Sequence, residues 1–364
     1  MNPIAQFSRS YAEARAKFQS AVRAQELSVE AHGLPDRHGI AGEPLVMDVA
    51  HLGDPDASGL LVLTSGTHGI EGYCGSGCQI GLLRDPAFID AVRRARIGVL
   101  FVHAVNPHGF SHGRRVNEDN VDLNRNFRDF SQPAPPCPGY AEIHPLLLPA
   151  TWPPPPDNER RLAALEAARG SRAFQAALTG GQYAFADGLF YGGARPAWSN
   201  LTLRAVLRRH AATRERLGWI DFHTGLGPRG HGERIYAGRD VPSDVARAHV
   251  WWGREVTSFR DGTSTSAAVS GIVTHAAYDE CRGVALAMIA LEYGTAPLAE
   301  VFAALRADHW LHHHADAPEA LRTAIRQQMR AAFHDETDEW KLKVYLQARK
   351  AALEAVAHLA PEYA

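Results

Sequence analysis

The stretch GLLVLTSGTHGIEG, residues 59–72, joins an apolar run to a glycine-rich polar turn. A short continuous run of Leu and Val that ends in turn residues is typical of a strand covered on both faces. The run breaks at Gly66, and His68 and Glu71 follow within five residues. We therefore expect a buried strand whose end presents two side chains that can bind a metal ion.

Similar apolar runs recur outward from this stretch, and segments with helical spacing separate them. An alternation of buried strands and helices favours an α/β fold. We predict a three-layer sandwich in which helices flank a mixed, mostly parallel central sheet. The other expected strands are PLVMDVA (44–50), IGVLFVHAV (97–105), LGWIDFHT (217–224) and MIALEYG (288–294), and the expected helices cover 8–24, 74–94, 159–178 and 242–258.

The chain length of 364 residues is compatible with one large α/β domain, and we expect residues 1–364 to form a single domain. Residues 132–158 hold ten of the 22 prolines, which predicts an irregular insertion because proline removes amide donors. This insertion is either a surface excursion or a wall of an active site. Residues 318–364 show the spacing of helices packed on one face.

The composition excludes several classes of protein. Hydrophobic residues make up 45% and charged residues 21%, and the formal net charge is −2, so no global field favours nucleic acid or an anionic membrane as partner. The N-terminal residues lack the apolar stretch of a signal peptide, and we expect a cytoplasmic protein. The four cysteines are too scattered for a disulfide framework and are expected to be buried thiols.

A second candidate ligand supports the first two. Taken alone, H-x-x-E at His68 and Glu71 is a weak signal, because a hydrogen-bonded histidine and a solvated glutamate give the same pattern. However, Asp221 and His223 stand at the end of another apolar run. Two histidines and one glutamate leave the fourth position of zinc open for water, which is typical of a catalytic site. We predict one Zn²⁺ ion.

Two further blocks carry hydrolytic chemistry. Residues 106–127 form a polar stretch in which Arg115 and Arg125 are candidates for stabilising an oxyanion, although a single arginine there could also form a surface salt bridge. Asp122 and Asn124 lie in the same stretch. Glu292 ends the apolar run MIALEYG, where an unpaired carboxylate is costly unless it has a function, so we expect a general base.

The blocks HGIE (68–71), NPHGF (106–110), VDLNRNF (121–127), DFHT (221–224) and LEYGT (291–295) occur in an order that resembles the M14 zinc carboxypeptidase family. SYAEARAKF (10–18) and LRADHWLHHH (305–314) narrow the resemblance to a bacterial and fungal, DUF2817-like branch. The resemblance implies a zinc carboxypeptidase-like domain. The short spacing from the arginines to Asn124 is nearer to the related succinylglutamate desuccinylase and aspartoacylase group.

The resemblance also implies roles for individual side chains. Zinc would be held by His68, Glu71 and His223, with Glu292 as the base. Arg115 would polarise the scissile carbonyl, with Arg114 as the alternative, and Asn124 with Arg125 would bind a substrate carboxylate. Asp122 would form a hydrogen bond with the first histidine ligand. Tyr278 would cap the substrate, with Tyr236 as the second candidate.

These features lead to one main functional prediction and two alternatives. The main prediction is zinc-dependent hydrolysis of an amide bond in a small molecule or short peptide with a free carboxylate. The alternatives are an N-acyl amino acid deacylase and a non-catalytic binding protein. A second metal at His231 and Glu233 stays open, whereas G-x-G-x-x-G at 225–230 and the histidines at 309–314 receive no role.

Overall fold

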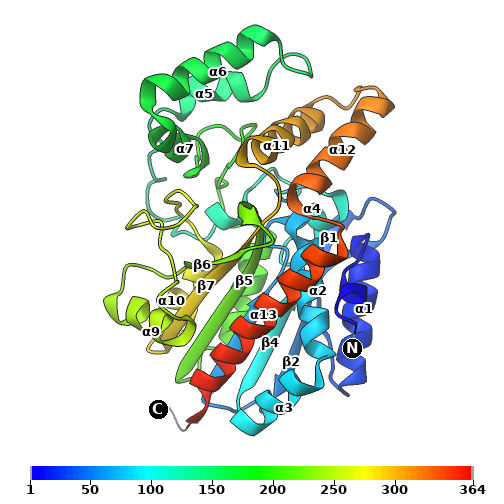
Figure 1. The fold of residues 1–364 in the computed structure, drawn as a ribbon, viewed down its shortest axis with the longest axis vertical. Helices are drawn as coiled ribbons and strands as arrows, with labels where there is room; N and C mark the ends of the chain where they lie inside the picture. The colour runs from blue at the N-terminus through cyan, green and yellow to red at the C-terminus, as the bar shows by residue number, and fades with distance from the viewer. Residues whose placement is uncertain (1, 362–364) are drawn as a thin grey trace.

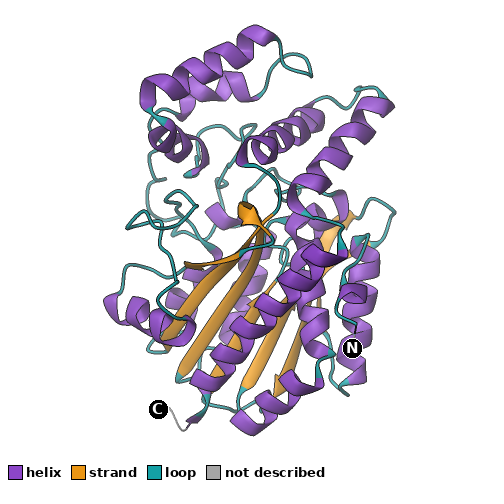
Figure 2. Cartoon of the chain, in the orientation of Figure 1, coloured by secondary structure: helices purple, strands orange, loops and turns teal. Residues whose placement is uncertain are grey.

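The computed structural model describes residues 2–361 and is built around one seven-stranded sheet (Figure 2). The strand order is β1-β2-β4-β3-β5-β7-β6. The strands are β1 (Glu30–His38), β2 (Pro44–Gly53), β3 (Gly59–Thr64), β4 (Gly98–His103), β5 (Arg216–Arg229), β6 (Gly232–Tyr236) and β7 (Ala285–Gly294).

The centre of the sheet is parallel and its edges are antiparallel. Strands β4, β3, β5 and β7 pair in parallel, whereas β2 pairs antiparallel with β1 and β4, and β6 pairs antiparallel with β7. The prediction of a mixed, mostly parallel sheet is confirmed. The carboxyl ends of the four parallel strands meet at one edge, which is where open α/β sheets place their sites.

Helices cover both faces of the sheet because the central strands are apolar on both sides. In β3, Leu61 and Leu63 join the core on one face, and Leu60 and Val62 join the core on the other. Figure 1 shows α13 running across the first face. The helices on that face are α1 (Tyr11–Ala24), α2 (Gly72–Leu83), α3 (Pro86–Ala95), α9 (Pro242–Trp252) and α13 (Asp338–Leu359). The helices on the other face are α8 (Trp198–His210) and α10 (Ala276–Glu280).

A third group of helices lies beyond the carboxyl edge of the sheet (Figure 1). Its apolar side chains form a separate core that includes residues of α1. The helices of this group are α4 (Pro107–His112), α5 (Tyr140–Leu147), α6 (Pro156–Arg169), α7 (Ser171–Thr179), α11 (Leu298–His313) and α12 (Glu319–Phe333).

Several boundaries differ from the expectation. The helix expected over 74–94 is two helices, since Asp85 caps the second by accepting from Ala87 N. The helix expected over 159–178 breaks at Gly170, whose φ of 79° favours glycine. The proline-rich segment is partly helical, because α5 contains Pro145 and α6 begins at Pro156. Every helix within residues 2–361 is too short or too polar to cross a membrane.

The cysteines and the C-terminal segment agree with the expectation. Cys74, Cys78 and Cys281 are buried, and Cys137 is half-buried. All four carry free thiols. Residues 318–364 hold helices α12 and α13 within the part that the structure describes, and α13 buries a full apolar stripe against the sheet.

Candidate metal centre and cavity

The three predicted ligands come together at the carboxyl edge of the sheet. His68 follows β3 in a turn in which Gly66 has a φ of 65°. Glu71 lies in the short 3₁₀ helix η2 (Gly69–Glu71) that leads into α2, and His223 lies in β5. Nitrogen or oxygen atoms of the three side chains lie within 4.8 Å of one another, and all three residues are buried.

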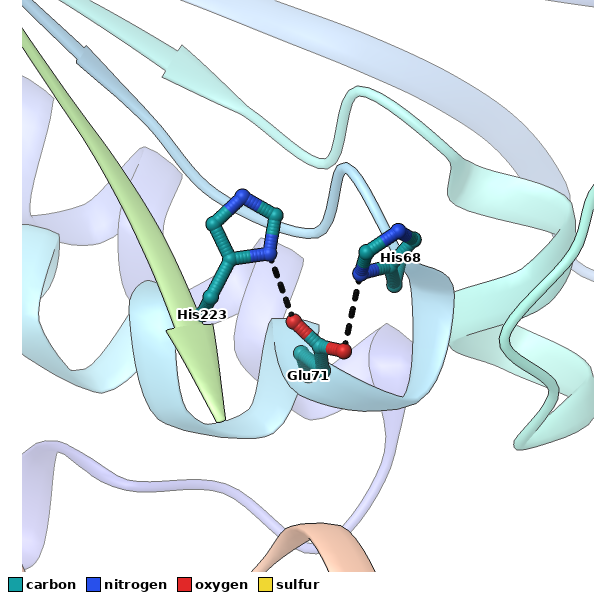
Figure 3. A group of neighbouring side chains, drawn as sticks. All are labelled: His68, Glu71 and His223. Carbon is teal, nitrogen blue, oxygen red and sulfur yellow. Dashed lines mark hydrogen bonds and ion pairs between the residues drawn. The ribbon is translucent and has the colours of Figure 1, made fainter. Parts of the chain in front are cut away.

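Glu71 stands between the two histidines (Figure 3). Its Oε1 is 2.8 Å from His68 Nδ1, and its Oε2 is 2.8 Å from His223 Nδ1. The backbone N–H of Thr224 also donates to Oε2, at 3.2 Å. Both imidazoles therefore turn the same ring nitrogen toward the centre of the group.

The outer nitrogen of each imidazole faces another carboxylate. His68 Nε2 is 3.2 Å from Asp122 Oδ1, and His223 Nε2 is 2.5 Å from Asp221 Oδ2. Asp221 is held in turn by the hydroxyls of Thr64 at 2.6 Å and Thr67 at 2.9 Å. Carboxylates in this position fix the tautomer and orientation of metal-binding histidines.

Neighbouring charges shift the pKa values of Asp122 and His223. Although burial acts to raise the pKa of Asp122, the guanidinium groups of Arg115 and Arg125 hold it well below the ordinary range. Burial acts to lower the pKa of His223, but Asp221 and Glu71 raise it well above its ordinary value. The set of two imidazoles and one carboxylate, with each imidazole anchored by a further carboxylate, fits the donor chemistry of zinc.

The two candidate oxyanion arginines differ in placement. Arg115 lines the cavity at the metal group and donates to Asp122 Oδ2 at 3.0 Å and to Glu71 Oε1 at 3.4 Å. Arg114 donates instead to Asp308 Oδ2 on α11 at 3.1 Å and does not line that cavity. The geometry therefore favours Arg115.

Asn124 and Arg125 also line the cavity. The side-chain oxygen of Asn124 accepts from Val273 N at 2.9 Å. Arg125 donates to the carbonyl of Thr179 at 3.1 and 2.6 Å and to that of Asn124 at 2.9 Å. The ring of Phe190 lies 5.9 Å from the Arg125 guanidinium and 5.4 Å from that of Arg115.

Glu292 lies beside the metal group. It is the register partner of His223 between β5 and β7, and it lines the same cavity. Leu226 N donates to its Oε1 at 3.0 Å. Burial and the nearby carboxylate of Glu71 raise the pKa of Glu292 to about 8.

The hydroxyls of the two candidate capping tyrosines bond to groups outside the metal centre. Tyr278 is outside the cavity lining, and its hydroxyl donates to Asp244 Oδ2 at 2.9 Å. Tyr236 lines the cavity, but its hydroxyl donates to Arg239 O at 2.7 Å. Within residues 2–361, the only group with metal-ligand spacing is the one at His68, so His231 and Glu233 do not form a second one. Residues 225–229 of G-x-G-x-x-G continue β5 rather than open a helix.

The role of Asp221 was missed in the sequence, although a signal was available. In D-F-H-T, Asp221 and His223 are two residues apart, and side chains at that spacing share one face of a strand. A carboxylate two residues before a histidine on the same strand can therefore reach that imidazole along the shared face. The structure shows that arrangement.

The cavity next to the metal group has a volume of about 600 Å³. Residues of α6, α7, α11 and the loop 259–272 form a large part of its lining. The proline-rich segment 132–158 contributes none of the lining residues, whereas α6 and α7 directly after it do. Of the two alternatives for segment 132–158, the wall is not observed, because these helices take that place.

Comparison with known proteins finds one matching family and several similar solved structures. Residues 7–347 match the family described as "Protein of unknown function (DUF2817)". No curated protein sequence matches the chain. One similar solved structure is carboxypeptidase A from Helicoverpa armigera, which is 14% identical over 89% of this chain and 74% of that chain, with a TM-score of 0.45. Another is a metallo-carboxypeptidase from Burkholderia cenocepacia, which is 14% identical over 99% of this chain and 71% of that chain, with a TM-score of 0.48.

Proposed function

We propose that this chain, which belongs to the DUF2817 family, is a zinc-dependent hydrolase of the metallocarboxypeptidase type that cleaves an amide bond next to a free carboxylate. The observation that carries the proposal is the buried group of His68, Glu71 and His223 at the carboxyl edge of the sheet. A carboxylate behind each imidazole and a cavity in front of the group support a catalytic site rather than a purely structural one.

Zinc bound by these residues would polarise the scissile carbonyl and acidify the attacking water. Glu292 accepts a proton from that water and passes it to the leaving nitrogen, so that the amide gives a carboxylic acid and an amine. Its position opposite His223 places it at the metal group, and the hydrogen bond from Leu226 N fixes one carboxylate oxygen.

The arginines supply positive charge on one side of the cavity. Arg115 stabilises the developing negative charge on the carbonyl oxygen, and its bond to Asp122 holds the guanidinium in place. Asn124 and Arg125 bind the free carboxylate of the substrate, because both line the cavity and Arg125 is anchored on Thr179. Arg114 and Tyr278 receive no part in the reaction, since their side chains are engaged elsewhere.

An N-acyl amino acid deacylase is the second candidate function. The observation that favours it is the limited volume of the cavity, about 600 Å³, since a cavity of this size suits a small substrate better than a long peptide. Comparison of dipeptides with N-acyl amino acids as substrates would separate the two activities.

The first test is the metal content of the purified protein, measured by mass spectrometry. We expect near-stoichiometric zinc in the wild type and its loss in the double variant His68→Ala, His223→Ala. Protein that contains no metal and takes none up on reconstitution would contradict the proposal and favour a non-catalytic binding protein.

The second test separates the metal from the base. Glu292→Gln should keep its zinc but lose about 10²- to 10⁴-fold in kcat. Glu354→Gln on α13, remote from the cavity, is the matched control and should keep both zinc and turnover. Equal turnover of wild type and Glu292→Gln would refute the assignment of the base.

A further inference from the structure

One side of the cavity is a continuous apolar wall built from three helices. The wall consists of buried or half-buried side chains that point into the cavity from α6, α7 and α11. These side chains, here called the apolar wall, are Leu162, Phe174, Leu178, Val301, Phe302 and Leu305.

The apolar wall begins next to the metal group. Thr224, the residue after His223, donates through its hydroxyl to the carbonyl of Phe333 at 2.7 Å. At Gly225 a Cβ atom would lie 3.0 Å from the Phe333 ring and 3.7 Å from Val301. The end of β5 is thus packed directly against the start of the wall, so a group bound there is adjacent to the reacting centre.

One of the two glutamates that α6 contributes to the cavity lining is neutralised by an ion pair. Glu159 of α6 forms an ion pair with Arg306 of α11 at 2.9 Å. Arg306 also donates to the carbonyl of Leu146 on α5 at 2.9 Å, so the helices are held together. Glu166 and Gln175, both half-buried, are further polar side chains that α6 and α7 give the cavity. The wall is therefore a formed apolar surface in the folded protein.

Arg125, which lines the cavity, is closely packed against two glycines. A Cβ atom at Gly271 would lie 2.2 Å from the carbonyl oxygen of Arg125, and one at Gly181 would lie 2.6 Å from its Cδ. Such close packing fixes the backbone and the side-chain stem of Arg125, so its guanidinium is held in place at the cavity.

We propose that the acyl side of the scissile amide is a large apolar group, an octanoyl chain or larger, which lies against the apolar wall while the carboxylate faces Arg125. This inference rests on the proposed function, because it names the substrate class of the same site. A cavity of about 600 Å³ is of the size that holds drug-sized ligands, and such cavities are mostly apolar with a few placed polar groups.

The test compares N-acetyl-, N-octanoyl- and N-dodecanoyl-L-alanine. In the zinc-loaded wild type, kcat/KM should rise about 100-fold or more from the acetyl to the octanoyl compound, since each fully buried methylene adds about fourfold in affinity. Binding to zinc-loaded Glu292→Gln, measured by calorimetry, should follow the same order without turnover. Equal kcat/KM and equal binding across the series would overturn the inference.

A matched pair of variants tests the wall itself. Leu298, at the start of α11, lines the cavity beside the six wall residues and is 54% exposed, and Leu201 on α8 is 57% exposed and outside the cavity lining. Leu298→Ser and Phe302→Ser should each lower the octanoyl-to-acetyl ratio about tenfold, whereas Leu201→Ser should leave the ratio unchanged. An unchanged ratio in both cavity variants, with folded protein, would count against the apolar wall.

The outcomes also distinguish this inference from the proposed function. Binding that increases with chain length in a protein that hydrolyses none of the three compounds supports the substrate class and contradicts the hydrolase. Hydrolysis confined to N-acetyl-L-alanine supports the hydrolase and contradicts the large apolar group.

Discussion

Arg114 and Arg115 are neighbours in sequence, but their guanidinium groups have different partners. Arg115 contacts Asp122 and Glu71 at the metal group, and Arg114 contacts Asp308 on α11. The peptide unit between them therefore separates a side chain at the metal group from one that links the segment after α4 to α11. Substitution of each arginine by methionine gives a test in which length is nearly kept and charge is lost.

Arg115→Met should lower kcat about 10²- to 10³-fold, which is the usual effect of losing one oxyanion donor. Arg114→Met should change kcat less than about threefold but reduce the free energy of unfolding by about 1–3 kcal/mol, because Asp308 loses its partner. Steady-state kinetics and urea denaturation measure the two effects. The reverse ranking in kcat would assign the oxyanion role to Arg114.

Asp221 forms a hydrogen bond with His223, the second proposed histidine ligand. In Asp221→Asn the charge behind His223 is lost, so the affinity for zinc should fall about 10- to 100-fold. Competition with a zinc-binding dye measures this affinity. Asp279→Asn, remote from the cavity, is the control and should bind zinc like the wild type. Unchanged affinity in Asp221→Asn would show that the negative charge behind His223 is not needed for zinc binding.

The metal group was predictable from sequence because each ligand follows an apolar run. The carboxyl ends of parallel strands meet at one edge of the sheet; His68 follows β3 there, and His223 and Glu292 lie in β5 and β7 where the apolar runs end. Tyr278 was not predictable in the same way. It lies in the short helix α10, and its orientation depends on Asp244 of α9, which is distant in sequence.

Arg306 joins elements that the sequence gives no reason to pair. It donates from α11 to Leu146 of α5, to Asn158 and to Glu159 of α6. Removal of these bonds should free α5 and α6 from α11. The apolar wall would then lose part of its support, because Leu162 lies on α6 and Leu305 on α11.

Arg306→Met should accelerate amide hydrogen exchange in α5 and α6 about 10- to 100-fold, as expected when local opening becomes easier by about 1.4–2.8 kcal/mol. Hydrogen exchange with mass spectrometry resolves these segments. Arg322→Met removes an arginine of α12 that pairs with Glu319 and should leave exchange in α5 and α6 unchanged. Exchange that rises only within α11 would show that α5 and α6 are held by other contacts.

Central and edge strands differ in how much their sequences reveal. The strands β2, β3, β4, β5 and β7 contain apolar runs, which correspond to the five expected segments. Strand β1 is mostly exposed at the sheet edge and contains Pro35, so its sequence carries little apolar signal. Strand β6 is only five residues long. Edge strands depend on a neighbouring strand for pairing, which local sequence does not report.

Several histidines are buried throughout the molecule, far from the metal group as well as near it. Burial lowers the pKa of His103, His108, His309 and His334 to about 3 in each case. His103 stacks on Phe18 with 4.5 Å between ring centroids. These side chains stay neutral in the fold at pH values where an unfolded chain would protonate them, so the whole fold is sensitive to acid.

The sign of this effect follows from linkage. The pKa of His103 in the fold is about 3, below its ordinary value of 6.5, so between these values the unfolded chain binds more protons and stability falls as pH falls. From pH 7.5 to 5.5, His103→Gln should therefore lose about 1.4 kcal/mol less unfolding free energy than the wild type. Urea denaturation at both pH values measures this difference, and the exposed His231→Gln is the control. Equal losses in wild type and His103→Gln would mean that the fold accepts a proton on His103 at pH 5.5.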